Sequence, residues 1–190
     1  MNILNTLTKE EVFDTKLIKI KSGYVLFREE EKCDSIGIIE KGKIEISTYL
    51  SNGEKIVYNT LKTGEIFGGN LIFSSDPFFK GNVVAIDDCE IRLISKYTLK
   101  KLFSQNEKFL ECYLQIQSNF TKKLNSKIKM LSMNSAQDRI LFMLECANSS
   151  EIKFKSITSL AENLGLSRES VSRTISKMVK ENAIIYSKNK

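Results

Sequence analysis

Residues 156–181 read SITSLAENLGLSRESVSRTISKMVKE and hold the most specific pattern in the chain. Apolar residues recur at helical spacing on both sides of Gly165, and Ser156 and Ser167 each stand where a helix N-cap is expected. Glycine takes the left-handed conformation that ends a helix at little steric cost. The pattern predicts two short helices joined by a tight turn, which is a helix-turn-helix.

The second predicted helix has one apolar and one polar face. Val171 and Ile175 lie on the apolar face, with either Met178 or Val179 following on the same side. The polar face carries side chains of the types that contact DNA from such helices: Arg168, Glu169, Ser172, Arg173 and Lys177. An ordinary helical hairpin with a solvated face would give a similar pattern, so two interpretations stand at this point.

The positive charge of the protein lies in its second half. The chain of 190 residues has a net charge of +6. Residues 1–103 hold 15 basic and 15 acidic side chains, whereas residues 104–190 hold 14 basic and 8 acidic ones. This asymmetry favours contact between the second half and a polyanion, although a solvated lysine-rich helix would have the same composition.

Several features predict a cytoplasmic protein. The sequence has no run of 18 apolar residues, so no membrane span is expected, and residues 1–13 lack the pattern of a signal peptide. The four cysteines form no C-x-x-C pair and suit reduced, buried thiols, although a redox sensor is an alternative. They are Cys33, Cys89, Cys112 and Cys146.

The first half of the chain has the two-residue period of β-strands. After a short helix at 8–14, seven strands are expected at 17–20, 24–27, 35–40, 43–50, 54–61, 82–86 and 90–94. Asn52-Gly53 is the sharpest of several hairpin signals between them. Many short, evenly spaced strands predict an antiparallel roll. The segment 67–81, which contains Pro77, interrupts this rhythm and is expected to line a pocket.

A long helix is expected over residues 106–133, after a shorter one that begins behind Ser95. A helix of this length extends ~40 Å, which is too long for a single small core to cover. Apolar residues at spacings of four or three trace one of its faces: Ile116, Phe120, Leu124, Ile128 and Leu131. Pairing with a second copy in a parallel homodimer would cover this face, and packing along the roll is the alternative.

An antiparallel roll, a long helix and a helix-turn-helix, in this order, resemble the Crp/Fnr family of bacterial transcription regulators. The resemblance covers nearly the whole chain, and its most specific part is residues 165–173, GLSRESVSR. The glycine turns at 41–42 and 63–65 and the triplet at 138–140 also match. The implied α+β fold has a double-stranded β-helix (an antiparallel β-roll), a dimerisation helix and a winged-helix-type unit.

The same resemblance divides the chain and assigns roles to single residues. An effector-binding-like roll is expected over 1–104, a dimerisation helix and hinge over 105–134, and the DNA-binding domain over 135–190. Glu169 and Arg173 stand at positions that contact base edges in the family, as a carboxylate can with cytosine and a guanidinium with guanine. Further base or phosphate contacts are implied for Ser156, Thr158, Arg168, Ser172 and Lys177.

The chain departs from the family in the effector pocket. Relatives that bind cyclic AMP carry Gly-Glu-Leu for the ribose and, further along, Arg-Ser for the phosphate. This chain has Gly68-Gly69-Asn70 and Phe79-Lys80 at the matching places, and a lysine lacks the guanidinium fork. We therefore expect no tight binding of cyclic AMP. The pocket candidates are Phe67, Gly68, Gly69, Asn70, Phe73, Phe79 and Lys80. Either an apolar effector binds there, or these rings fill an unused pocket.

A second departure concerns the wing that follows the recognition helix in relatives. Residues 183–186 suit its first strand, and the sequence ends at Lys190, so an abbreviated wing is expected, with Lys188 and Lys190 offsetting part of the loss electrostatically. This lends some weight to a DNA-binding-deficient partner of other regulators. A metal enzyme on the roll is least favoured, because a chain without histidine cannot form the usual facial triad.

The resulting prediction is a regulator and not an enzyme. Its expected partners are double-stranded DNA, a second copy of the chain and, as a further candidate, RNA polymerase. No cofactor is expected: the lack of histidine disfavours haem, and no cluster of cysteines suits iron–sulfur ligation.

Overall fold

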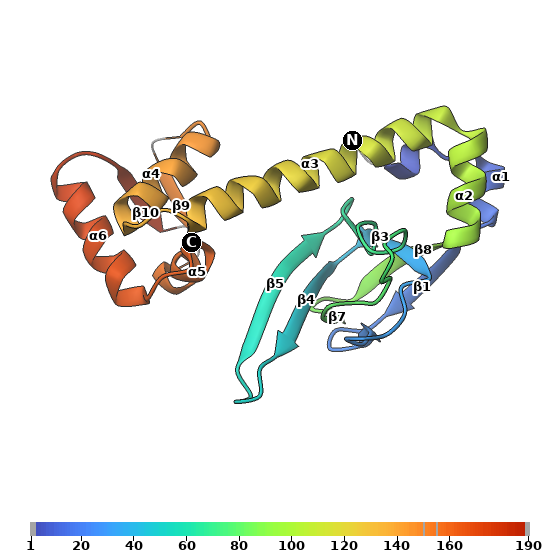
Figure 1. Cartoon of the computed structure of the whole chain (residues 1–190), viewed down its shortest axis with the longest axis horizontal. Helices are drawn as coiled ribbons and strands as arrows, with labels where there is room; N and C mark the ends of the chain where they lie inside the picture. Colours follow the sequence, from blue (N-terminus) through green and yellow to red (C-terminus); the bar gives the residue numbers. More distant parts are fainter. Residues whose placement is uncertain (1–2, 150, 155, 189–190) are drawn as a thin grey trace. The chain divides into compact units, whose positions relative to one another are not determined.

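The computed structural model of this protein describes residues 3–149, 151–154 and 156–188. The chain forms two compact units, Met1–Ser118 and Asn119–Lys190 (Figure 1). The first unit contains the elements η1 (Ile3–Thr6), α1 (Lys9–Phe13), β1 (Lys16–Ile20), β2 (Val25–Phe27), β3 (Ser35–Lys41), β4 (Lys43–Tyr49), β5 (Lys55–Lys62), β6 (Ile66–Phe67), β7 (Asn82–Ala85), β8 (Cys89–Ser95) and α2 (Lys96–Gln105). The helix α3 (Glu107–Leu131) begins in this unit and ends in the second.

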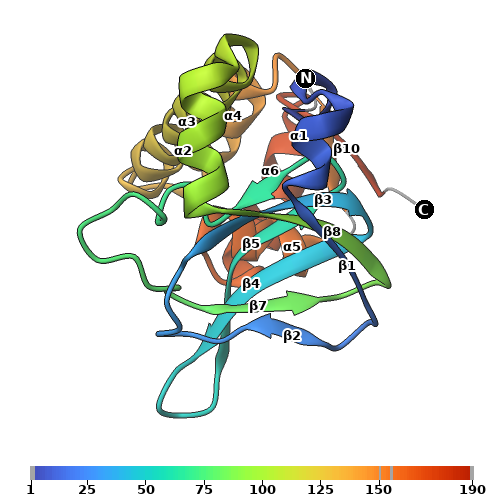
Figure 2. The same cartoon turned by 90° about the vertical axis from the view of Figure 1, so that its right-hand side faces the viewer.

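The strands of the first unit form two four-stranded antiparallel sheets (Figure 2). The strand order is β1-β8-β3-β6 in one sheet and β2-β7-β4-β5 in the other. All seven expected strands are present, each end to within one residue, and the antiparallel architecture is confirmed. The two-residue strand β6 was not expected. Two residues carry too little of a period to be recognised, and β6 exists because β3 offers it an edge.

The core of the first unit contains side chains from both sheets and from α2 and α3. Buried side chains alternate along β7 and the start of β8, as the two-residue period requires, whereas residues 36–39 of β3 are all buried. The fully buried members on the strands are mostly isoleucine and valine: Ile36, Ile38, Ile39, Ile44, Val83, Ile91 and Ile94. These β-branched side chains suit the pleated surface of a strand, which is why the first half of the sequence has a clear strand signal.

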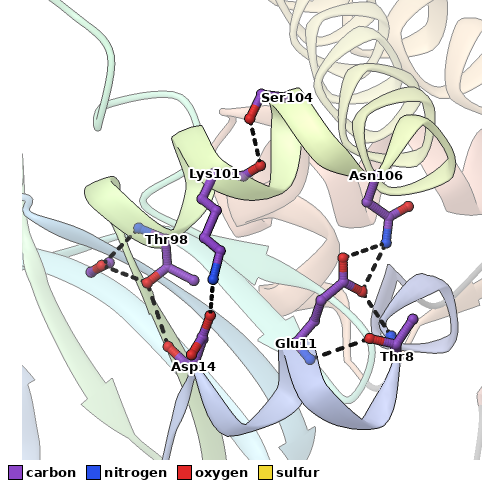
Figure 3. Close-up of polar contacts among 8 residues, drawn as sticks. Thr8, Glu11, Asp14, Thr98, Lys101, Ser104 and Asn106 are labelled. Atoms are coloured by element: carbon purple, nitrogen blue, oxygen red, sulfur yellow. Dashed lines mark hydrogen bonds and ion pairs between the residues drawn. The ribbon is translucent and has the colours of Figure 1, made fainter.

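Polar contacts tie α1 to the elbow between α2 and α3 (Figure 3). The Asn106 amide donates to the Thr6 carbonyl at 2.9 Å and to the Glu11 carboxylate at 2.9 Å, while its oxygen caps α3 at the Phe109 N–H. The Lys101 ammonium forms an ion pair of 2.7 Å with Asp14. The start of the long helix is therefore held to the N-terminal segment.

We expect Glu11 to make this elbow sensitive to acid. Burial of the carboxyl raises its pKa, but hydrogen bonds from Thr8 and Asn106 and the charge of Lys101 outweigh this and lower the pKa below 4.5. Because the folded state favours the carboxylate, this stabilisation is present above the unfolded pKa and is lost as the pH falls through the folded pKa. Thermal melting of Glu11→Gln should vary less than that of the parent between about pH 6 and pH 3.

Glu10→Gln is the matched control, since Glu10 is the exposed neighbour of Glu11 in the same helix. It should melt with the pH profile of the parent. An identical profile for the parent and Glu11→Gln would contradict the role given to Glu11.

In its described residues, the second unit contains the end of α3, three further helices and a small sheet. Its elements are α4 (Ala136–Cys146), β9 (Glu151–Phe154), α5 (Ile157–Leu164), α6 (Arg168–Lys180) and β10 (Ile185–Lys188). Their apolar faces meet in one core, which includes Met130, Ile140, Leu144, Ile152, Leu160, Leu164, Val171, Ile175, Met178 and Ile184. The strand expected at 183–186 is found as β10, two residues later, where it pairs in parallel with the unexpected β9.

Candidate DNA-binding surface

The segment 156–181 folds as two helices around a left-handed glycine. Ser156 caps α5 by accepting from the Ser159 N–H at 3.1 Å, and Ser167 caps α6 by accepting from the Ser170 N–H at 3.2 Å. Gly165 ends α5 with φ 63° and ψ 43°. Both N-caps and the glycine turn predicted from the sequence are confirmed.

Packing fixes which face of α6 is exposed. Val171, Ile175 and Met178 are buried against the core of the second unit, whereas Val179 is 41% exposed. The choice that the sequence left open therefore falls on Met178. Because these three residues hold one side of α6, its polar residues are turned toward solvent.

The charged residues at the start of α6 are available for external contacts. Arg168, Glu169 and Arg173 are exposed, and no hydrogen bond or ion pair engages their side chains in the part of the chain that the structure describes. No salt bridge therefore joins Glu169 to either arginine among the described residues. Ser172 is half-buried beside them.

An open hollow of about 440 Å³ lies along the same helix. Its lining consists of Ser172, Arg173, Ser176, Lys177, Lys180 and Glu181. Lys177 is exposed, and its ammonium lies 4.0 Å from the Glu181 carboxylate. The other two expected phosphate contacts, Ser156 and Thr158, are exposed at the N-terminus of α5. The structure thus gathers Ser172, Arg173 and Lys177 on the surface of α6.

The aromatic residues of the expected effector pocket fall into two groups. Phe67 and Phe79 are buried, where Phe27 stacks on Phe79 at 4.7 Å and meets Phe67 edge-on at 6.2 Å between ring centroids. The ring of Phe67 covers Gly37 so closely that a Cβ atom there would lie 1.9 Å from it. Phe73, in contrast, is 43% exposed and lies under the Lys96 ammonium.

The polar candidates of that pocket have partners outside the roll core. The Lys80 ammonium is exposed and pairs with Asp76 at 2.9 Å and Glu30 at 3.7 Å. The Gly69 carbonyl accepts from the Tyr113 hydroxyl of α3 at 2.7 Å, and burial raises the pKa of that phenol to about 12. Gly68 takes a positive φ of 77° and Asn70 is exposed. Tyr113 was not among the pocket candidates predicted from the sequence.

The apolar face predicted on the long helix is present and largely uncovered. Ile116 packs against the core of the first unit. The remaining four members, which we call the α3 stripe, are 40–55% exposed: Phe120, Leu124, Ile128 and Leu131. Large apolar side chains at this exposure along one helix face are typical of an interaction surface.

Three of the four cysteines are buried, and Cys146 is exposed. Burial raises the pKa of the Cys33 thiol to about 11, which makes it a poor thiolate. Among the described residues, no group of three or more potential ligands is placed to hold a metal ion. The same residues include no helix with the length and apolar character needed to cross a membrane.

Comparison with known proteins gives a consistent result. Residues 17–106 match the model of the cyclic nucleotide-binding domain. The Anaerobic regulatory protein of Bacillus subtilis (strain 168) is 24% identical over 176 residues, which cover 87% of this chain and 74% of that protein.

Two solved structures share the fold. The Catabolite Activator Protein of Thermus thermophilus is 18% identical, with a TM-score of 0.60 over 96% of this chain and 88% of that one. The global regulator CLP of Xanthomonas campestris, described as responsive to c-di-GMP, is 18% identical, with a TM-score of 0.65 over 97% of this chain and 99% of that one.

The chain thus joins a cyclic nucleotide-binding domain to a second, helical unit, and the proteins reported above that it resembles are transcription regulators. This chain is similar over most of its length to members of the Crp/Fnr family. The relatives reported above are regulators and not enzymes.

Proposed function

We propose that the protein is a sequence-specific transcription regulator that binds an inverted-repeat operator as a homodimer. The observation that carries this proposal is that charged side chains in the first half of α6 are exposed and have no hydrogen-bond or ion-pair partner among the described residues. An arginine there can donate two hydrogen bonds to guanine, and a carboxylate can accept from the amino group of cytosine. Arg168, Glu169 and Arg173 suit these contacts because no described partner holds them in place.

Two further features support DNA as the ligand. The basic excess of the chain lies in residues 104–190, so its positive potential belongs to the half that contains α6. The first turn of α6 also adds its own N–H groups, whose partial positive charge favours a phosphate. Lys177 and Lys180 extend this potential along the helix surface.

The α3 stripe supports the dimer. Four large apolar side chains at spacings of four, four and three would otherwise remain in water, at a cost of about 25 cal/mol for each Å² of apolar surface. Two copies of α3 packed in parallel would bury both stripes and present two α6 helices. Two-fold symmetry of the protein then predicts two-fold symmetry of the operator.

The test is selection of bound duplexes from a random pool by the full chain at a stated salt concentration. We expect an inverted repeat whose half-sites lie ~34–36 Å apart, and an affinity that falls steeply with added salt. Failure to enrich any sequence would contradict the proposal and would favour a partner protein that does not bind DNA. RNA polymerase, the further candidate partner, is tested by measuring whether it binds the complex of the protein with its operator.

We also propose that cyclic AMP is not the effector. A buried cyclic phosphate needs a paired cation, and the cation at the matching place, Lys80, is exposed and already paired with Asp76 and Glu30. The buried rings of Phe67 and Phe79 support the interpretation that side chains fill this part of the roll. Titration calorimetry with cyclic AMP should show no binding tighter than about 1 mM, a free energy of about −4 kcal/mol.

Micromolar binding would contradict this prediction. A thermal-shift screen with apolar and aromatic compounds separates the two remaining interpretations of the pocket. A ligand at 100 times its Kd should stabilise the protein by about 2.7 kcal/mol. If the phenylalanine rings already fill the pocket, no compound should produce such a shift.

A further inference from the structure

Arg139 connects the end of α3 to the turn between α5 and α6. It lies on α4, and its guanidinium donates to four backbone carbonyls. Nε donates to Met133 at 3.0 Å and Nη2 to Leu131 at 2.9 Å, at the end of α3 and just after it. Nη1 donates to Leu164 at 2.8 Å and Gly165 at 3.2 Å, at the end of α5.

A second cation reaches the same end of α5. The Lys127 ammonium, from α3, donates to the Asn163 carbonyl. Burial, together with the nearby charge of Arg139, lowers the pKa of Lys127. The last carbonyls of a helix lack partners within it and carry a partial negative charge, so cations placed there stabilise the helix end. Both α3 and α4 therefore supply a cation to the C-terminus of α5.

The fit between α3 and the turn is also steric. A Cβ atom on Gly165 would lie 2.8 Å from Cδ2 of Leu131, which is closer than such contacts occur. The turn therefore approaches the last residue of α3 directly. Arg139 fills the remaining space with hydrogen bonds, and only a guanidinium offers enough N–H groups in a fixed plane for four separate carbonyls.

We propose that Arg139 is a positioning residue that sets the angle between the end of α3 and the α5–α6 pair. This inference rests on the proposed function, because that angle matters when two α3 helices form the dimer and each α6 must meet its own half-site. The apolar core holds the helices together through Met130, Ile140 and Leu164. Arg139 also fixes their relative direction, since its four acceptors lie on two separate stretches of the chain, residues 131–133 and residues 164–165.

The first test uses the free protein. Hydrogen exchange in Arg139→Gln should be faster, by about tenfold, at the Met133 and Leu166 amides, which bond to Met130 and Ala161 beside the contacts that are lost. Arg139→Lys keeps the charge but lacks the fork, and should give most of the same increase. Arg28→Gln, an exposed arginine of the roll, is the matched control and should exchange as the parent does.

The second test measures affinity for operators whose half-sites are moved apart or together by one base pair. The parent should prefer the selected spacing by about tenfold, and Arg139→Gln should reduce this preference to about threefold or less. A merely structural role would lower the affinity for every spacing by the same factor. Thermal melting gives the folded fraction for each variant.

Each outcome decides the matter. Faster exchange together with a flattened spacing preference supports the proposal. Unchanged exchange, or an equal loss at all spacings, overturns it. If the parent selects no operator, the proposed function fails. Unchanged exchange in Arg139→Gln would still overturn the positioning role, whereas faster exchange would support the role of Arg139 in holding the end of α3 to the turn between α5 and α6.

Discussion

Replacing Leu124 and Ile128 by glutamate is expected to turn the protein into a monomer and to lower its affinity for an inverted repeat by about 100-fold or more. Both side chains belong to the α3 stripe and are about half exposed in the single chain. In a parallel pair of helices each would face its own copy, so four carboxylates would meet along the seam. Their desolvation and mutual repulsion would prevent association.

The loss of affinity follows from the loss of the second half-site. A dimer binds its second half-site as an intramolecular event, whereas a monomer gains no such advantage. Sedimentation equilibrium measures the oligomeric state, and a mobility shift with the selected operator measures the affinity. Circular dichroism checks that the helices remain folded.

A control with the same added charge distinguishes disruption of the α3 stripe from a general effect of negative charge on DNA binding. Ser118 and Ser126 are exposed and, at 3.6 residues per turn, lie on the side of α3 away from the stripe. Ser118→Glu with Ser126→Glu should remain dimeric and keep most of the affinity of the parent. A dimeric, tightly binding Leu124→Glu, Ile128→Glu variant would show that the stripe is not the dimer interface.

Replacement of Arg173 by alanine has the second largest expected effect. We expect a loss of ~1–3 kcal/mol on the selected operator, and relaxed discrimination at a single base pair of each half-site. The reason is the bidentate contact that an exposed, unpaired guanidinium can make with one guanine. Competition binding with operators substituted at each position measures both quantities.

Lys177→Ala is the comparison variant, because it removes an expected phosphate contact and leaves the expected base contact of Arg173 in place. Its ammonium is a point charge beside Glu181, suited to a phosphate and not to a base edge. Its removal should weaken binding about equally on all sequences and reduce the salt dependence by the equivalent of about one phosphate contact. If Arg173→Ala bound the operator and a scrambled duplex as the parent does, Arg173 would not contact a base.

Local signals made the two helices and the glycine turn of residues 156–181 predictable from the sequence. Ser156, Gly165 and Ser167 act on backbone groups within three or four residues of themselves, so their roles follow from spacing alone. The strand period of the roll is similarly local, because β-branched residues alternate on a two-sided surface. The α3 stripe was predictable for the same reason, although its exposure is a property of the folded chain.

Contacts between distant segments were not predictable in this way. Arg139 was visible in the sequence only as part of a family-like triplet, and its four carbonyl partners become neighbours after folding. Lys80 was considered as a charge for a bound phosphate, whereas the structure pairs it with Asp76 and Glu30. The parallel pairing of β9 with β10 joins segments about 30 residues apart, which no local period reveals.

The central claim is that two copies of this chain bind one operator through their α6 helices. Sedimentation of the full chain with the selected duplex, at a stated salt concentration and with excess non-specific DNA, tests it most directly. The account predicts two chains per duplex, with an affinity at least about 1,000-fold above that for a scrambled sequence. One chain per duplex, or equal affinity for both sequences, would contradict it.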